Sequence, residues 1–358
     1  MEYTLRQQML TLSYLSYLGF GLTLDKTRNE HHIYKLVTDG LSDWKPLENE
    51  WEIAWGPAVH RFPFAIFDDN LMYVVKHTLQ DDTYAIVIRG TNPIGLWDWL
   101  LEDLLVQRLV PWKSDKVSEN SNPRISYSTH LGLSTLTELT AAEDLPGEGH
   151  TLQDFLKKVV AETSSDKVKV YVTGHSLGGA LAPLLTLWLS DRQGTGAECW
   201  DPDSCVELSC YAFAGPSPGN SDFSAYYDSQ LGDRTERIHN SLDVVPHAWA
   251  PSSMKNLLSI YEGTATPSTI MKSAYYFLKF STSHLDYEQI KPDTPAFVGE
   301  INPALKLFDL QMVDQHMMGY LREFGLADEL AFDFLKQELT RIYKRIEKRL
   351  DKIPLSGV

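Results

Sequence analysis

Apolar positions along the chain fall into short runs with two different spacings. Runs rich in β-branched and aromatic residues predict buried strands at residues 72–75, 84–88, 168–172 and 208–213. Apolar side chains at helical spacing predict helices at residues 152–162 and 177–190, before and after the third of these strands. Strands that alternate with helices predict an α/β fold with a mostly parallel central sheet and helices on both faces. The first two strands lie close together in the chain and are expected to pair as an antiparallel edge.

The remaining pattern concerns loops and domain organisation. Polar residues at 114–126 and 191–204 predict surface loops. Apolar residues at helical spacing between residues 335 and 350, with lysine and arginine between them, predict an amphipathic closing helix. Neither a repeat nor a low-complexity linker divides the 358 residues, so we expect one domain over residues 1–358.

The formal net charge of −16, from 32 basic and 48 acidic residues, narrows the classes of partner. It argues against nucleic acid, which requires a basic surface, and against a purely electrostatic hold on anionic membranes. No run of about 18 apolar residues predicts a spanning helix, so we expect no stable membrane insertion. The first residues lack a signal-peptide pattern, so we expect a cytoplasmic protein or the mature or truncated form of a secreted one. The oligomeric state is left open.

The three cysteines, Cys199, Cys205 and Cys210, lie in one short stretch. They are interpreted as plain thiols, with a local Cys199–Cys205 disulfide as the alternative. No C-x-x-C pair or neighbouring histidine supports a zinc site, so no metal is expected.

The most informative motif is G-H-S-L-G at residues 174–178, which follows a predicted strand and precedes a predicted helix. This is the context of a nucleophile elbow, in which Ser176 sits on a strained turn above the sheet. Gly174 and Gly178 would permit that turn, because a Cβ at either position would clash. The positive end of the following helix would face a developing oxyanion, with the backbone N–H of Leu177 as one donor.

Four blocks of sequence resemble the class 3 lipase family, the fungal-type lipases of the α/β-hydrolase superfamily, and in particular its longer bacterial members. They are residues 88–104, residues 130–133 (H-L-G-L, with Leu133 in place of the family's Phe), residues 172–182 around Ser176, and residues 213–246. The blocks cover the chain from Tyr84 to Pro246, and the resemblance is weaker on either side.

The resemblance implies an α/β-hydrolase fold with catalytic residues in the order Ser, Asp, His. Asp243 is the candidate acid, because it follows a predicted strand end and precedes a turn that contains Pro246. The alternative is that Asp243 only caps that turn.

Two histidines are candidates for the base. His316 opens a helical pattern with a Tyr four residues on, as in the longer bacterial members, whereas the sequence around His284 resembles the ending of the fungal members. We favour His316 and keep His284 as the alternative, while His247 lies too close to Asp243 in the chain. His175 and His130 are interpreted as structural.

The resemblance also implies roles for residues outside the Ser, Asp and His positions. Thr91 is the expected second oxyanion donor beside Leu177. Apolar residues recur at helical spacing through Trp97, Leu100, Leu101 and Leu104, so residues 92–106 are a possible lid, with a fixed core helix as the alternative. Residues 253–283 are a possible cap, and their run Y-Y-F-L at 275–278 is aromatic enough to line an acyl pocket.

The sequence therefore predicts a serine carboxylic-ester hydrolase, a lipase that cleaves acylglycerols and other fatty-acid esters, with an oil–water interface as one expected place of action. The mechanism requires no metal or organic cofactor. Alternatives are a phospholipase A1 or a feruloyl-type esterase on the same scaffold, and a lipase-like signalling scaffold without catalysis. Acyl chain length and the natural substrate are open.

Overall fold

The computed structural model describes residues 3–19, 26–60, 70–90, 104–196 and 198–328. The predicted C-terminal helix at residues 335–350 and most of the possible lid at residues 92–106 lie outside these ranges. No helix among the described residues combines the length and the apolar character needed to cross a bilayer.

A central sheet of six strands organises the molecule, in the order β1-β2-β3-β6-β7-β9. Its strands are β1 (Trp51–His60), β2 (Asn70–His77), β3 (Thr83–Ile88), β6 (Val168–His175), β7 (Val206–Phe213) and β9 (Thr235–Ile238). The pairs β1–β2 and β2–β3 are antiparallel, and β3, β6, β7 and β9 are parallel to one another. The predicted fold class and the antiparallel pairing of the first two predicted strands are both confirmed.

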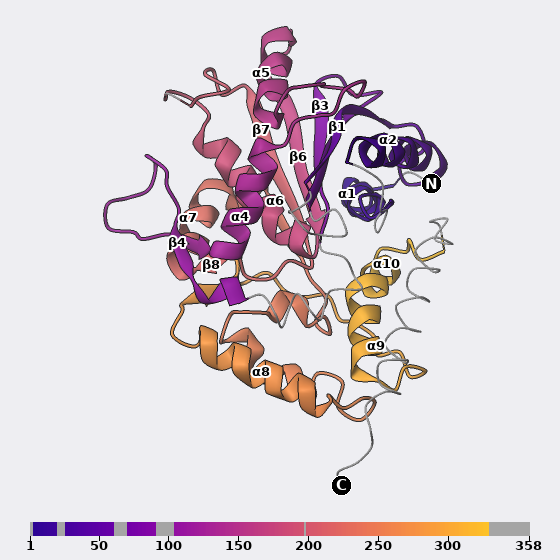
Figure 1. Ribbon diagram of the computed structural model, residues 1–358, viewed down its shortest axis with the longest axis vertical. Coiled ribbons are helices and arrows are strands. Elements are labelled where there is room, and N and C mark those ends of the chain that lie inside the picture. Colours follow the sequence, from indigo (N-terminus) through magenta and orange to yellow (C-terminus); the bar gives the residue numbers. More distant parts are fainter. Residues whose placement is uncertain (1–2, 20–25, 61–69, 91–103, 197, 329–358) are drawn as a thin grey trace.

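Helices cover both faces of this sheet (Figure 1). One face carries α1 (Leu5–Leu15) and α2 (Lys26–Asp43), and the other carries α4 (Tyr127–Glu138), α5 (Leu152–Glu162), α6 (Leu177–Asp191) and α7 (Ser221–Leu231). The predicted helices at residues 152–162 and 177–190 are α5 and α6. Because side chains alternate across a strand, Ile86 and Ile88 of β3 join the core under α6, whereas Ala85 and Val87 join the core under α1.

A second, smaller sheet was not predicted from the sequence. It has the order β10-β8-β5-β4, formed by β4 (Leu109–Pro111), β5 (Arg124–Ser126), β8 (Gly219–Asn220) and β10 (Tyr287–Glu288). Strands of two or three residues have no hydrophobic period that a sequence pattern can show. The polar stretch at 114–126 is therefore a loop whose last residues belong to this sheet.

The segment after β9 passes through short helical turns before the final helices. These are η4 (Val245–His247), η5 (Ser253–Ser259), α8 (Thr269–Thr282), α9 (Phe308–Val313), the π-helical turn η6 (Asp314–Met318) and α10 (Gly319–Glu323). Within the possible cap, Tyr275 and Leu278 are buried but Tyr276 and Phe277 face solvent. Half of the aromatic run expected to line a pocket therefore points outward. All three cysteines are free thiols, as predicted.

Candidate active site

Ser176 occupies a sharp turn between β6 and α6. Its φ of +63° and ψ of −126° lie where a residue with a side chain is strained. A Cβ on Gly174 would lie 2.3 Å from the Gly178 carbonyl oxygen, and one on Gly178 would lie 2.4 Å from the Ile88 oxygen. Both contacts are with backbone that cannot yield, so the predicted need for glycine at both positions is confirmed.

The Ser176 side chain is buried, but its hydroxyl is not used in a structural hydrogen bond within the described part of the chain. Its residue is 1% exposed, and its Oγ has no hydrogen-bond partner among the described residues. The Ser176 backbone N–H donates to the Phe213 oxygen at 3.0 Å, which ties the turn to the end of β7. Gly90, after β3, approaches so closely that an added Cβ would lie 3.0 Å from the Ser176 Cβ. A buried hydroxyl without a partner is rare and points to a functional role.

Asp243 lies in the turn that follows β9 and is fully buried. Its Oδ1 accepts from the Val245 backbone N–H at 3.0 Å, so it does cap the turn before Pro246. Its Oδ2 accepts from His316 Nδ1 at 2.8 Å and from the Tyr320 hydroxyl at 2.9 Å. Capping of the turn occupies one carboxylate oxygen and the contact with His316 uses the other, so the first does not exclude a role of Asp243 as the acid.

His316 lies in the π-helical turn η6, between α9 and α10, with 1% of the residue exposed. Because Asp243 accepts from Nδ1, the neutral ring carries its proton there and keeps a lone pair on Nε2. That Nε2 has no hydrogen-bond partner among the described residues. His284 instead lies exposed in the turn after α8. The structure thus places His316 against Asp243, in the relation that a general base has to its orienting acid.

His175 anchors the backbone of the turn that carries His316. Its Nε2 lies 2.9 Å from the His316 carbonyl oxygen, and its Nδ1 lies 2.9 Å from the Tyr17 hydroxyl. Burial, and then the neighbouring His316 ring, hold the pKa of His175 well below its ordinary value. A neutral ring that donates to a carbonyl from Nε2 can only accept at Nδ1, so Tyr17 is the donor there. The structural interpretation of His175 is confirmed.

Helix α1 supplies a second anchor to the same turn. The Tyr14 hydroxyl donates to the Met317 carbonyl oxygen at 2.5 Å. Helix α1 is itself fixed to β6 through the Ser13 and Thr173 hydroxyls, which are 2.9 Å apart. Sequence reasoning missed these N-terminal contacts, since the partners are separated by about three hundred residues and no local pattern links them.

Asn240 joins the turn of Asp243 to η6 from the other side. Its side-chain amide donates to the Gln315 carbonyl oxygen at 3.1 Å and to Gln315 Oε1 at 2.9 Å. Its backbone N–H donates to the Tyr320 hydroxyl at 3.2 Å. Tyr320 therefore accepts from one end of this turn and donates to Asp243 at the other, so Asp243 and the turn that carries His316 are held as one unit.

His239 is a further buried histidine near the site that the sequence did not single out. Burial, followed by the nearby Arg237 and His247, lowers the pKa of His239 to about 3. Its Nδ1 has no hydrogen-bond partner among the described residues. His239 is thus an uncharged ring at neutral pH. His130, also expected to be structural, stacks on Tyr127 within α4.

Of the remaining predicted site residues, only some lie in the described part of the chain. Thr91, Trp97, Leu100 and Leu101 lie outside the described residues, and Leu104 begins the short helix η2 (Leu104–Gln107). Leu177 is the first residue of α6, so its backbone N–H has no acceptor within the helix.

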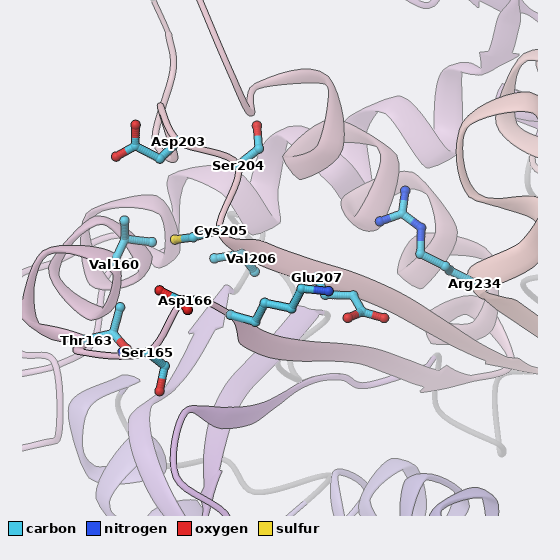
Figure 2. Close-up of a pocket in the computed structure, with 11 residues that line it drawn as sticks. Val160, Thr163, Ser165, Asp166, Asp203, Ser204, Cys205, Val206, Glu207 and Arg234 are labelled. Atoms are coloured by element: carbon cyan, nitrogen blue, oxygen red, sulfur yellow. The ribbon is translucent and has the colours of Figure 1, made fainter.

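A cavity of about 700 Å³ lies elsewhere (Figure 2). It is lined by residues at or just before the amino ends of β6, β7 and β9, including Asp166, Lys167, Glu207 and Arg234. Ser176 follows the carboxyl end of β6, so this open, charged hollow is at the opposite end of the sheet. It does not belong to the candidate active site.

The sheet, the strained serine turn after β6 and the order Ser176, Asp243, His316 define the class of protein. It is an α/β-hydrolase in which the candidate acid Asp243 contacts the candidate base His316.

Comparison with known proteins agrees with this class. The family model described as Lipase (class 3) matches residues 85–252. The crystal structure of M37 lipase is 39% identical, with a TM-score of 0.87, and the match covers 95% of this chain and 100% of that one. The chain belongs to the class 3 lipase family. The predicted fold and family are therefore confirmed, and so, at the level of the family, is the predicted class of ester hydrolase.

Two further relatives match a smaller part of the chain. Phospholipase A1-II 1 of Oryza sativa subsp. indica is 26% identical over 216 residues, which is 60% of this chain and 51% of that protein. A lipase of Rhizopus niveus is 39% identical over 85 residues, which is 24% of this chain and 20% of the relative. The chain therefore spans about half the length of the rice relative and less of the fungal one.

Proposed function

We propose that this protein is a serine carboxylic-ester hydrolase of the lipase type, with Ser176 as nucleophile, His316 as base and Asp243 as orienting acid. The proposal rests mainly on two buried atoms that have no hydrogen-bond partner among the described residues, Ser176 Oγ and His316 Nε2, together with the 2.8 Å contact of His316 Nδ1 with Asp243. A nucleophile and a base that are kept free of structural hydrogen bonds remain available for substrate.

The proposed reaction is acyl transfer in two steps. His316 Nε2 takes the proton of Ser176 while Oγ attacks the ester carbonyl, and Asp243 stabilises the imidazolium that forms. The tetrahedral intermediate then expels the alcohol, which leaves with the proton from His316. Water attacks the acyl-enzyme by the same path and releases the fatty acid together with free Ser176.

The oxyanion would be stabilised at the start of α6. The backbone N–H of Leu177 has no helical acceptor, and the positive end of the 15-residue helix α6 favours negative charge at this point. Thr91 is proposed as the second donor from its family position. Removing one donor of this kind typically costs about 3 kcal/mol of transition-state stabilisation.

The proposed substrates are acylglycerols and other esters of fatty acids. The similarity to M37 lipase supports this class. The name of the rice relative, phospholipase A1-II 1, favours a second candidate, removal of the sn-1 acyl chain of a phospholipid. A phosphatidylcholine with different acyl chains at sn-1 and sn-2 distinguishes the two, because a phospholipase A1 releases the sn-1 acid and a lipase prefers triacylglycerol.

The test compares hydrolysis of p-nitrophenyl esters with short and long acyl chains by the wild type and three variants. Ser176→Ala and His316→Ala are expected to lose at least about 10⁴-fold in kcat, because a serine triad acts as a unit. His284→Ala is the matched control, since it removes the alternative base from an exposed position.

The outcomes separate the parts of the proposal. A dead His284→Ala variant beside an active His316→Ala variant would move the base and leave Ser176 in place. A wild type that hydrolyses neither soluble esters nor emulsified triacylglycerol would overturn the enzyme assignment in favour of a non-catalytic scaffold.

A further inference from the structure

Helix α8 has an inner face that is well packed. Met271, Tyr275, Leu278 and Thr282 are buried, and the Tyr275 hydroxyl donates to the Met254 oxygen at 2.9 Å. Tyr275 and Leu278 share a hydrophobic cluster with Val106 of η2 and with residues 248–250, which follow Asp243. The helix is thus fixed to the segments that lead out of the candidate active site, at the end of the molecule farthest from α5 (Figure 1).

The outer face of α8 is aromatic and uncovered. Tyr276 is 61% exposed, Phe277 is 50% exposed and Phe280 is 80% exposed. These are three of the six large hydrophobic side chains that are exposed in the described part of the chain. Single exposed apolar residues are normal, but several on one helix face mark an interaction site.

The charge on this helix is opposite in sign to that of the protein. The exposed Lys272 and Lys279 flank the aromatic residues, and residues 269–282 contain no aspartate or glutamate, in a chain of net charge −16. The nearest acidic residues in the sequence are Glu262 and Asp286, and Asp286 accepts a hydrogen bond from the Ser221 hydroxyl. The aromatic face therefore has a basic rim.

We propose that the outer face of α8, defined by Lys272, Tyr276, Phe277, Lys279 and Phe280, docks the protein on an anionic phospholipid surface. This inference deepens the proposed function, because it names the surface from which a lipid ester would reach the site. Aromatic rings suit the boundary between headgroups and acyl chains, and lysines beside them bind anionic headgroups.

The net charge of the whole protein does not prevent such docking. Exposed charges farther apart than about 8 Å are largely screened at physiological ionic strength, so the two lysines at the contact outweigh distant carboxylates. Each phenylalanine that enters the boundary adds a favourable term that is independent of salt. Docking through the outer face of α8 is peripheral and requires no helix to span the bilayer.

The experiment measures flotation with vesicles, using Ser176→Ala as the parent so that no lipid is consumed. Vesicles of phosphatidylcholine alone are compared with an equimolar mixture of phosphatidylcholine and phosphatidylglycerol. Phe277→Ser with Phe280→Ser is expected to weaken binding to the mixture by about tenfold per residue. Lys272→Gln with Lys279→Gln is expected to weaken it by about fivefold per lysine, with little effect on phosphatidylcholine alone.

Leu79→Ser is the matched control, because Leu79 is 81% exposed in the turn between β2 and β3, away from α8. Equal binding by the parent, the Phe277→Ser/Phe280→Ser variant and the Leu79→Ser variant would overturn the proposal. So would a change from dimer to monomer in the double phenylalanine variant without lipid, because the face would then join two copies of the chain.

Hydrolysis of soluble p-nitrophenyl butyrate by the same surface variants with Ser176 intact separates this inference from the proposed function. The expected result is unchanged hydrolysis together with lost vesicle binding. Full hydrolysis without vesicle binding by the unmodified chain would overturn the docking proposal alone, and binding without any hydrolysis would overturn the proposed function alone.

Discussion

Each residue of the candidate triad is held by neighbours before a substrate arrives. Ser176 is held by backbone strain and by glycines that admit no Cβ, whereas Asp243 is held by hydrogen bonds to both carboxylate oxygens. His316 is fixed through Nδ1 alone, which leaves Nε2 free to exchange a proton. The site therefore restricts the geometry of every group but provides, among the described residues, no hydrogen-bond partner for Ser176 Oγ and His316 Nε2, the atoms that would react.

Tyr320 is expected to act through Asp243. Tyr320→Phe removes the 2.9 Å hydrogen bond to Asp243 Oδ2 and should lower kcat about tenfold with little change in KM, because hydrogen bonds to charged groups contribute about 1.5–3 kcal/mol. Phosphorylation of Ser176 by diisopropyl fluorophosphate should slow by a similar factor.

Tyr261→Phe is the control for this variant, since Tyr261 is another buried tyrosine near the site but donates to the Leu242 backbone oxygen. Equal losses of kcat in Tyr320→Phe and Tyr261→Phe would show that the effect is a general loss of packing order rather than a contact with Asp243.

The buried neutral histidine His239 is expected to make folding sensitive to acid. Its pKa is about 3 in the fold against an ordinary value of 6.5, so the unfolded chain takes up a proton as pH falls through 6.5 and the folded chain does not. Stability is therefore fully present above about pH 6.5 and is lost below it, by about 2 kcal/mol between about pH 7.5 and pH 5. His239→Gln should lose correspondingly less over that interval in urea-unfolding measurements. An equal pH dependence in wild type and variant would contradict this assignment.

At the scale of elements, the π-helical turn η6 needs support from outside itself. A π turn is less favourable than a regular α-helical turn and is retained mostly at functional sites. Here α1 and the end of β6 supply it, through Tyr14 on the Met317 oxygen and His175 on the His316 oxygen. The first helix of the chain thereby positions a side chain near the end of the described chain.

Tyr14→Phe is expected to lower kcat by roughly tenfold and to leave KM unchanged, because the lost hydrogen bond loosens the backbone that carries His316. Tyr73→Phe is a matched control, since Tyr73 is also fully buried and donates to a backbone oxygen of the same helix, that of Leu12, at 2.9 Å. Both variants should lose about 1 kcal/mol of unfolding free energy, but only Tyr14→Phe should lose activity. Steady-state kinetics checks the loss of activity, and thermal unfolding checks the loss of stability, in both variants. An intact kcat in Tyr14→Phe would assign α1 a purely structural role.

At the scale of the whole molecule, stability rests on two hydrophobic cores on either side of one sheet rather than on covalent cross-links. The cores under α6 and under α1 share β3 and β7 through the alternation of their side chains. Burial also raises the pKa of the Cys210 thiol to about 12 and that of Cys205 to about 11. Neither thiol is a ready nucleophile near neutral pH.

Because all three cysteines are free, reducing agent is expected to leave both the unfolding temperature and the activity unchanged. Differential scanning calorimetry with and without dithiothreitol checks the first point, and an ester-hydrolysis assay checks the second. A fall in Tm on reduction by several degrees would reveal a disulfide, since a native disulfide typically contributes about 2–5 kcal/mol.

Much of the fold and of the candidate site could be predicted from the sequence by local physics. The predicted strands at residues 84–88 and 168–172 are short apolar runs and the helix at 152–162 has a helical period, and both patterns are visible within a window of about ten residues. Ser176 was identifiable because its strain requires glycine on both sides, and that requirement is visible within five residues. The parallel sheet followed from the alternation of these elements.

Only the tertiary structure decided which distant residues meet. His316 and His284 carry comparable local patterns, and the choice of partner for Asp243 depends on how residues 244–315 return to the sheet. The anchoring of η6 by Tyr14, the short strands β8 and β10, and the outward face of α8 likewise depend on contacts between segments far apart in the chain. A local hydrophobic period determines which face of an element is buried, but it contains no information about which other segment covers that face.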